Sequence, residues 1–249
     1  MLLTVQTPTA NILGNPQEPD KISNEDSQLL YGETFQVEKG HGAYVYGYNT
    51  LDGYKGFVER DQLIKNAPLA NIAVQVRSTH LYREPDFKSR PAKRLSFLSR
   101  LSMTEETSNG FVKLQNGLWL FADHARALDG FQMPDDMAQT ATLYLNTPYL
   151  FGGRSVFGID CSGLIQQIMM AHDHPCPPRD TGDQTGAFGT KIERKDIRRN
   201  DIVFFKGHVG IMMDDKYILN ATARHMSTVM EDLDDLEKIY EGITYIARI

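Results

Sequence analysis

Short runs of alternating apolar and polar residues fill the chain up to about residue 125. Clear examples are ETFQVEKG (33–40), NIAVQVRSTHLY (71–82) and GFVKLQNGLWLFA (110–122). A period of two is the pattern of a strand that buries one face. Turn signals such as Leu51-Asp52-Gly53 separate the runs. Strands this short, at this spacing, are typical of small all-β barrels.

The same outline occurs twice in this region. LLYGETFQVEKGHGAYVYGYNTLDGYKGFVERDQL (29–63) and KRLSFLSRLSMTEETSNGFVKLQNGLWLFADHARAL (93–128) share it: a strand, a variable loop, a strand, a glycine turn, and a strand that opens near an aromatic residue. The repeat favours two tandem barrels over one large sheet. Both halves resemble bacterial SH3-like domains in pattern, so we expect two small all-β SH3-like barrels at 1–65 and 66–128.

The periodicity changes near residue 130. MPDDMAQTATLYL (133–145) predicts a helix with acidic residues in its first turn, where they favour the helix dipole. CSGLIQQIMMAHD (161–173) predicts a buried helix with one apolar face, made of Leu164, Ile165, Ile168 and Met169. Strand patterns return in DIVFFKGHVGIMMDDKYILNATA (201–223). The segment 129–249 is therefore expected to be an α+β domain.

Composition narrows the classes of function. Hydrophobic residues make up 41% of the chain and charged residues 23%, which fits a globular protein. The net charge is −6 and no long basic run occurs, so nucleic acid is not an expected partner. Two cysteines do not make a disulfide framework, and no Cys/His cluster has zinc spacing. We expect no metal and no cofactor.

The first residues, MLLTVQTPTANILGNPQEPDK, do not form a recognisable signal peptide. No run of about 18 apolar residues occurs, so a membrane helix is not expected. The expectation is a cytoplasmic protein with no membrane partner. Oligomeric state is not readable from the pattern.

Cys161 stands in an unusual local setting. Asp160-Cys161-Ser162-Gly163 begins the predicted buried helix. A thiol there faces unpaired backbone N–H groups and the positive end of the helix dipole, which both favour the reactive thiolate. The same N–H groups are suited to hold the oxyanion of an acyl-transfer intermediate. The alternative is that Cys161 is a small buried hydrophobic residue.

A nucleophilic cysteine needs a base, and His208 is the candidate among seven histidines because it opens an apolar strand. A turn near Asp214-Asp215 would place His208 opposite Asn220, whose side chain could orient the imidazole. Two alternatives stay open. His208 and Asn220 are satisfied polar groups at strand ends, or a one-residue slip puts them on opposite faces.

Three separated segments together resemble the NlpC/P60 family of cysteine peptidases, which has a papain-like fold. They are TPYLFGGRSVFGIDCSGLIQ (147–166), PPRDTGDQ (177–184) and RRNDIVFFKGHVGIMMDDKYILNA (198–221). The resemblance implies that Cys161 is the nucleophile and His208 the base. Asn220 takes the third position, where the family often has histidine. The resemblance also implies that Tyr149 helps to form the oxyanion hole, and Ser162 is expected to line the same pocket.

The two barrels and the GGRS-x-FG-x-DCSG and PRD-xx-Q motifs resemble γ-D-glutamyl-L-diamino acid endopeptidases. These enzymes cut murein peptides that begin with a free L-Ala, which implies a site for an ammonium group. Asp160, Glu33 and Tyr54 match that role. The alternatives are a solvated strand end for Glu33 and an ordinary barrel tyrosine for Tyr54. Arg179 and Asp180 are expected either to contact the peptide or to brace their loop.

The expected partner is therefore a murein peptide, L-Ala-γ-D-Glu-diamino acid, whose third residue is meso-diaminopimelate or lysine. Two other functions remain open. One is an exported peptidoglycan hydrolase that grips intact cell wall through its SH3-like domains. The other is a catalytically inactive module that binds wall peptides.

Overall fold

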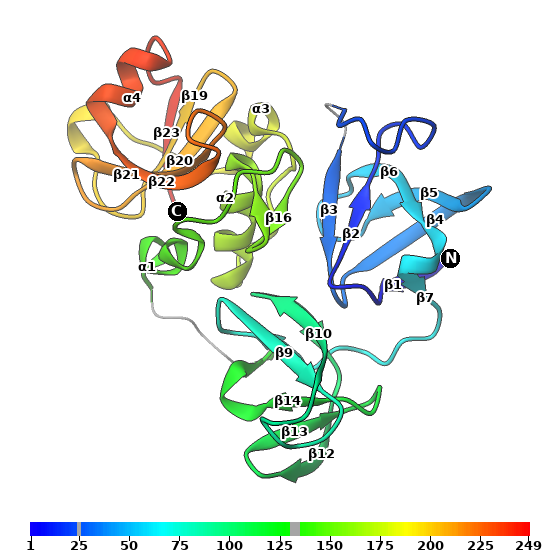
Figure 1. The fold of residues 1–249 in the computed structure, drawn as a ribbon. Helices are drawn as coiled ribbons and strands as arrows, with labels where there is room; N and C mark the ends of the chain where they lie inside the picture. The colour runs from blue at the N-terminus through cyan, green and yellow to red at the C-terminus, as the bar shows by residue number, and fades with distance from the viewer. Residues whose placement is uncertain (24–25, 130–134) are drawn as a thin grey trace. The chain divides into compact units, whose positions relative to one another are not determined.

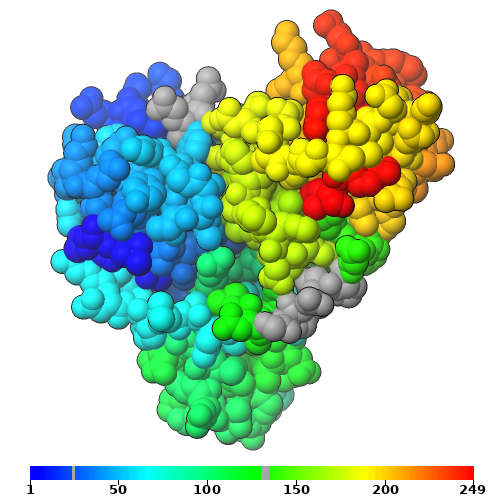
Figure 2. Space-filling view, turned by 180° about the vertical axis from the view of Figure 1, so that it is seen from behind, coloured from blue at the N-terminus to red at the C-terminus, as the bar shows by residue number. Residues whose placement is uncertain are grey.

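The computed structural model describes residues 1–23, 26–129 and 135–249. The chain divides into two compact units, Met1–Phe131 and Gln132–Ile249 (Figure 1). The described part of the first unit consists of strands and two short 3-10 helices, and that of the second combines helices with a six-stranded sheet. Figure 2 shows the same chain with its atoms as spheres, coloured by residue number as in Figure 1.

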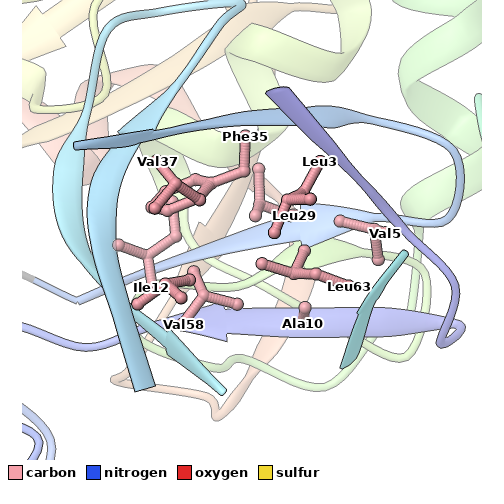
Figure 3. Packing of buried hydrophobic residues seen from close by; sticks show 10 residues of the cluster. Leu3, Val5, Ala10, Ile12, Leu29, Phe35, Val37, Val58 and Leu63 are labelled. Atoms are coloured by element: carbon pink, nitrogen blue, oxygen red, sulfur yellow. The ribbon is translucent and has the colours of Figure 1, made fainter. Parts of the chain in front are cut away.

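The first half of unit one contains a five-stranded sheet and a separate strand pair. The sheet order is β6-β5-β4-β1-β7, and β2 pairs with β3. The strands are β1 (Leu2–Val5), β2 (Thr9–Ile12), β3 (Ser27–Leu30), β4 (Thr34–His41), β5 (Tyr44–Asn49), β6 (Lys55–Glu59) and β7 (Leu63–Ile64). Their alternate side chains, such as Leu3, Phe35 and Val58, form one buried cluster (Figure 3).

The second half of unit one has sheets of its own, ordered β10-β9-β14-β13-β12 and β11-β8-β15. The strands are β8 (Ile72–Val74), β9 (Ser78–Tyr82), β10 (Pro91–Ser96), β11 (Arg100–Leu101), β12 (Met103–Ser108), β13 (Phe111–Leu114), β14 (Trp119–Phe121) and β15 (Ala125–Ala127). Their core, which includes Val74, Leu81 and Leu120, is distinct from the first.

The internal repeat is visible in how each half ends. In the first half β6 runs into the 3-10 helix η1 (Arg60–Gln62) and then β7. In the second half β14 runs into η2 (Ala122–His124) and then β15. Both 3-10 helices follow an extended residue, and both close with the same backbone bond to their first carbonyl. Two similar strand arrangements with separate cores therefore follow one another, and their assignment as SH3-like barrels stays a prediction.

The second unit is built on the antiparallel sheet β18-β23-β19-β20-β21-β22. Its strands are β18 (Thr190–Lys191), β19 (Ile202–Phe205), β20 (His208–Met212), β21 (Tyr217–Thr222), β22 (Ser227–Asp232) and β23 (Tyr245–Arg248). A small hairpin, β16 (Arg154–Ser155) with β17 (Gly158–Ile159), precedes the central helix α2. The helices are α1 (Met137–Ala141), α2 (Cys161–Ala171), α3 (Thr181–Gln184) and α4 (Leu233–Ile239), with 3-10 turns η3 (Thr142–Tyr144), η4 (Thr185–Ala187) and η5 (Arg194–Asp196).

Helix α2 packs against β20 and β21. The predicted apolar face of α2 is buried, but so are Gln166 and Gln167 on its other side. The helix is therefore buried, as the sequence predicts, and its burial extends to the side that carries Gln166 and Gln167. In the part of the chain that the structure describes, no helix has the length and apolarity needed to cross a membrane.

The helix predicted at 133–145 is shorter than expected. Its residues 133 and 134 lie outside the described residues, and the observed helix α1 begins at Met137. Asp136 is its N-cap, where the carboxylate accepts a hydrogen bond from the Gln139 N–H at 3.1 Å. An N-cap residue lies just outside the helix, because its side chain bonds the free backbone N–H groups of the first turn. The helix therefore begins at Met137, directly after Asp136.

The predicted hairpin of β20 and β21 is present, but its register is wrong by two residues. Ile211 pairs with Leu219 and Met212 with Ile218, so Gly210 stands opposite Asn220. The Asp214 carboxylate accepts hydrogen bonds from the Lys216 and Tyr217 N–H groups and draws the turn toward its C-terminal side. Because the shift is an even number, His208 and Asn220 remain on the same face of the sheet.

Candidate active site

Cys161 is the first residue of α2. Asp160 caps this helix: its backbone is extended, and its Oδ1 accepts a hydrogen bond from the Gly163 N–H at 2.7 Å. Cys161 is buried, with 8% of its surface exposed. Its Sγ lies 3.7 Å from the Thr181 hydroxyl at the start of α3. The N-cap therefore fixes the thiol at the positive end of a buried helix, as the D-C-S-G spacing predicts.

The carboxylate of Asp160 is surrounded by protein donors. Arg179 donates to Oδ2 at 2.5 Å and to Oδ1 at 3.1 Å, and the Gly152 N–H donates to Oδ2 at 2.8 Å. The Ser162 hydroxyl donates to Oδ1 at 3.3 Å and accepts from Arg179 at 2.7 Å. Asp160 and Arg179 are 5% and 4% exposed. We call Asp160, Ser162 and Arg179 the nucleophile-side network, because it holds the turn that presents Cys161.

Arg179 was expected to contact the peptide or to brace its loop. Its guanidinium donates to Asp160 and Ser162, so it braces the turn, and its contact with the peptide stays a prediction. Ser162 is likewise held in this network, and the expectation that it lines the pocket stays a prediction. Asp180 is exposed at the N-cap of α3. Its peptide contact also stays a prediction.

His208 and Asn220 make the contact that the sequence predicts. The His208 Nε2 lies 2.9 Å from the Asn220 Oδ1. The contact is diagonal across the two strands, since Gly210 is the direct partner of Asn220 and has no side chain to separate them. Both residues are buried, with 5% and 0% of their surfaces exposed.

Glu231 on β22 fixes which way round this amide lies. The Asn220 Nδ2 donates to the Glu231 carboxylate at 3.0 Å. An ionised carboxylate only accepts hydrogen bonds, so the amide nitrogen must face Glu231 and the amide oxygen must face His208. The His208 Nε2 is then the protonated nitrogen in the neutral ring, and its Nδ1 carries the lone pair. This is the tautomer that a general base needs.

Tyr240 contacts the imidazole directly, and Arg224 contacts both Tyr240 and Glu231. The Tyr240 ring stacks on His208 with centroids 4.7 Å apart and planes 7° apart. The Arg224 guanidinium lies 5.8 Å from the Tyr240 ring centre and pairs with Glu231 at 2.8 Å. We call His208, Asn220, Glu231, Arg224 and Tyr240 the imidazole-side network.

Three observations bring the thiol and the imidazole into one site. Helix α2 packs against β20, the strand that begins with His208. The Val209 backbone N–H, next to His208, is near enough to the Cys161 Sγ to stabilise its ionised form. Tyr149 experiences the charges of both Cys161 and Tyr240, and Tyr240 stacks on His208.

Burial of the site opposes the thiolate that the position of Cys161 at the start of the helix favours. Burial, with the nearby Asp160 charge, raises the pKa of the Cys161 thiol to about 11. Burial lowers the pKa of His208 to about 4, against the opposing effect of its bond to Asn220. Desolvation therefore opposes the helix dipole, and both pKa shifts favour a neutral thiol and a neutral imidazole near neutral pH. Proton transfer then has to accompany the attack of sulfur.

Tyr149 is placed to donate a hydrogen bond near the thiol. It is half-buried, and its backbone N–H donates to the Met226 carbonyl at 3.0 Å. Burial and the neighbouring Cys161 and Asp160 charges raise the pKa of its phenol well above the usual range. The phenol therefore keeps its proton and remains a donor, as an oxyanion-hole role requires.

Glu33 and Tyr54, the predicted amine contacts, belong to unit one. Glu33 is 2% exposed and its carboxylate accepts from the Leu30 N–H at 3.0 Å, so it is not a solvated strand end. Tyr54 is half-buried beside the turn formed by Asp52. Their role toward a substrate stays a prediction.

Thr181, Glu231 and Tyr240 are site residues that sequence reasoning missed. Thr181 follows the PRD motif directly, so the motif itself was the signal. Glu231 stands on the strand that pairs with β21, and extending the hairpin pattern by one strand would have indicated it. Tyr240 lies beyond α4 and carries no local signal.

The arrangement suits acyl transfer by a thiol and an imidazole. Within the three described ranges of the chain, no group of three or more His, Cys, Asp or Glu side chains is placed to hold a metal ion. Cys161 and Cys176 are both free thiols, so they form no disulfide with each other.

Comparison with known proteins agrees with this chemistry. The sequence profile of the NlpC/P60 family matches residues 146–240. A Gamma-D-glutamyl-L-lysine dipeptidyl-peptidase of Bacillus subtilis is 30% identical over 237 residues, covering 86% of this chain and 77% of that protein. The Dipeptidyl-peptidase 6 of Lysinibacillus sphaericus is 25% identical, covering 90% of this chain and 89% of the relative.

A solved structure shares the fold. The crystal structure of an NlpC/P60 family protein from Bacillus cereus superposes with a TM-score of 0.84 at 21% identity. The match covers 100% of this chain and 99% of the other. The strand-rich mixed α/β architecture is thus that of a known protein over its whole length.

Proposed function

The chain belongs to the NlpC/P60 family of peptidases, and from that premise we propose that it cuts murein peptides with a free N-terminal L-Ala. The bond cleaved is the one between γ-D-glutamate and the diamino acid. The observation that supports the chemistry is the chain of hydrogen bonds from His208 through Asn220 to Glu231, which leaves the His208 Nδ1 unprotonated and able to accept a proton. The relative named for γ-D-glutamyl-L-lysine supports the choice of bond.

The reaction begins with a neutral pair. The His208 Nδ1 takes the thiol proton as the Cys161 sulfur attacks the γ-carbonyl carbon of D-glutamate. The backbone N–H groups at the start of α2 and the Tyr149 hydroxyl donate to the developing oxyanion. His208, now protonated, gives its proton to the departing amine of the diamino acid.

The second half of the reaction removes the acyl group. A water molecule donates a proton to the His208 Nδ1 and attacks the thioester carbon. The tetrahedral intermediate collapses, the carbon–sulfur bond breaks, and the Cys161 sulfur recovers the proton from His208. The products are the dipeptide L-Ala-γ-D-Glu and the diamino acid fragment. No cofactor enters either step.

Selection for a free amine needs carboxylates and a hydroxyl around an ammonium group. We assign Glu33 and Tyr54 of unit one, with Asp160, to that role. The assignment follows from the positions of these residues in the motifs that resemble γ-D-glutamyl-L-diamino acid endopeptidases. The two halves of unit one are proposed to be SH3-like barrels.

A filter for free amines suits small fragments better than intact wall. We therefore propose that the enzyme acts in the cytoplasm, on murein peptides that are being recycled. Hydrolysis of intact wall after export is the competing function. Binding of wall peptides without catalysis is the other.

One assay separates these functions. L-Ala-γ-D-Glu-meso-diaminopimelate, its lysine counterpart, the N-acetylated form of each and intact sacculi are compared as substrates by product chromatography. The proposal predicts cleavage of at least one free-amine tripeptide and weak or no cleavage of N-acetylated peptides and sacculi. Equal cleavage of the acetylated forms would overturn the amine filter. Cleavage of sacculi alone would establish the wall hydrolase, and no cleavage of any substrate the inactive module.

A further inference from the structure

A cleft of about 610 Å³ lies in unit one where its two halves meet. Its walls come from β1 and the turn before β4, from the linker near Ala67, and from β10, β11 and the β13–β14 turn. The volume is within the range of ligand sites in proteins, about 300–1,000 Å³. The cleft, which we call the inter-core cleft, shares no residue with the site around Cys161.

Specific contacts between the two halves fix its walls. The Arg100 N–H donates to the Tyr31 carbonyl at 2.8 Å, and the Lys93 ammonium donates to the Gln6 carbonyl at 2.8 Å. Gly32 makes this approach possible. Its φ is +79°, and a Cβ there would lie 2.0 Å from the Arg100 carbonyl oxygen. Only glycine fits, so the two halves are shaped to meet here.

The charges of the cleft are all of one sign. Arg83, Lys93 and Arg100 line it, and no aspartate or glutamate does. Within residues 1–23, 26–129 and 135–249, none of the three forms an ion pair with a carboxylate. The whole chain carries a net charge of −6, so the charge of this cluster is opposite in sign to the net charge of the protein. Gathering like charges costs free energy that a bound anion would offset.

Neutral donors stand beside the cations. The Asn116 amide donates to the Tyr31 hydroxyl oxygen at 3.0 Å, which leaves the Tyr31 proton to be donated elsewhere. Burial raises the pKa of Tyr31, so it remains a donor. Apolar side chains cover the remaining wall, among them Val5, Ile64, Leu101 and Leu118.

We propose that the inter-core cleft binds a small molecule with at least two carboxylate or phosphate groups on a less polar body. Two guanidinium groups hold such anions through paired hydrogen bonds, and the lysine adds a third positive charge. The apolar wall accepts the rest of the molecule. This site is independent of the peptidase activity, because it uses none of the residues assigned to catalysis.

The test is an NMR titration of the full-length ¹⁵N-labelled chain carrying Cys161→Ala, which prevents turnover. The probes are γ-D-glutamyl-meso-diaminopimelate, as a source of carboxylates, and inorganic pyrophosphate, as a source of phosphates. Saturable shifts are expected at the amides of Gly32 and Ala70 and at the Asn116 side chain. Saturation by either probe supports the site and identifies its anion.

Variants show whether the cations are responsible. Arg83→Gln combined with Arg100→Gln should weaken binding at least about tenfold, because charge-assisted hydrogen bonds are lost. Arg90→Gln, which removes an exposed charge that does not line the cleft, should leave the affinity unchanged. The Arg83 and Arg100 side chains make no hydrogen bond in the described structure, so the double variant should keep its dispersed spectrum. Absence of saturable shifts with both probes, or equal affinity in the double variant, overturns the proposal.

Discussion

The two networks that flank Cys161 are built on different principles. On the nucleophile side, one carboxylate receives five hydrogen bonds, and its partner Arg179 is as buried as Asp160 itself. On the imidazole side, the bonds run in a line from His208 to Asn220 to Glu231. That line ends at Arg224 and His225, whose side chains are 31% and 49% exposed.

The difference separates structural from catalytic effects. Removal of one member of a buried ion pair is strongly destabilising, because it leaves the other charge buried and uncompensated. Substitutions in a linear network that reaches solvent have smaller effects on stability, because water and mobile side chains replace part of each lost interaction. Changes on the nucleophile side should therefore cost stability, and changes on the imidazole side should alter rate and pH dependence.

The largest effect is expected from Arg179→Met. The Asp160 carboxylate would lose its buried partner, which should lower the free energy of unfolding by about 3–5 kcal/mol. Urea unfolding followed by circular dichroism measures it. Arg194→Met is the matched control, because it breaks partly exposed pairs with Asp234 and Glu237 and should cost at most about 1 kcal/mol. Equal losses of unfolding free energy in the two variants would contradict the structural role of the nucleophile-side network.

The next effect concerns stability against pH. His208 has a pKa of about 4 in the folded chain and 6.5 without the burial. Between these values the unfolded chain binds more protons, so stability is full above pH 6.5 and falls as the pH drops toward 4. The loss amounts to at most about 3 kcal/mol. Unfolding in urea at pH 7, 5.5 and 4 should show a steeper decline for the native chain than for His208→Gln. Parallel declines would mean that His208 is not held neutral.

Asn220→Ala tests the tautomer. Loss of the amide oxygen frees the imidazole to turn or to move its proton, so kcat should fall about 10- to 100-fold with little change in KM. Asn220→His restores a group that can accept the Nε2 proton and should recover part of the rate. Steady-state kinetics on the tripeptide gives both values. A change confined to KM, or no difference between the alanine and histidine variants, would argue against a positioning role.

The smallest effects are two opposite shifts of the pH–rate profile. The Glu231 charge raises the pKa of His208 and the Arg224 charge lowers it. Glu231→Gln should therefore move the acid limb of kcat/KM to lower pH, and Arg224→Gln should move it to higher pH, each by a fraction of a unit. Lys238→Gln changes a charge outside the network and should move nothing. Shifts of the same sign in the first two variants would refute the assignment.

Much of the site was predictable because its signals are local. Asp160 followed by Ser-Gly predicts a capped helix, and the structure has that cap. Alternation along VGIMM and YILNA predicts the hairpin, and a side chain on one face can still reach a diagonal neighbour. The contact between His208 and Asn220 therefore survived a register error of two residues.

What the sequence did not predict depends on burial and on distant partners. The helix dipole at Cys161 is visible in the pattern, but the desolvation that opposes it requires the packing of α2 on the sheet. Arg179 is 19 residues from Asp160, and no spacing rule connects them. Tyr240 reaches His208 only because β22 and α4 return the chain to the site.

The most direct test of the central claim is to trap the acyl group on the enzyme. The full-length chain is mixed with the tripeptide, quenched in acid within the first turnover, and analysed by intact mass and peptide mapping. The account predicts a thioester that carries L-Ala-γ-D-Glu on Cys161, unchanged in Cys176→Ala and absent in Cys161→Ala, which should also lose hydrolysis. Hydrolysis by Cys161→Ala at the native rate would contradict it.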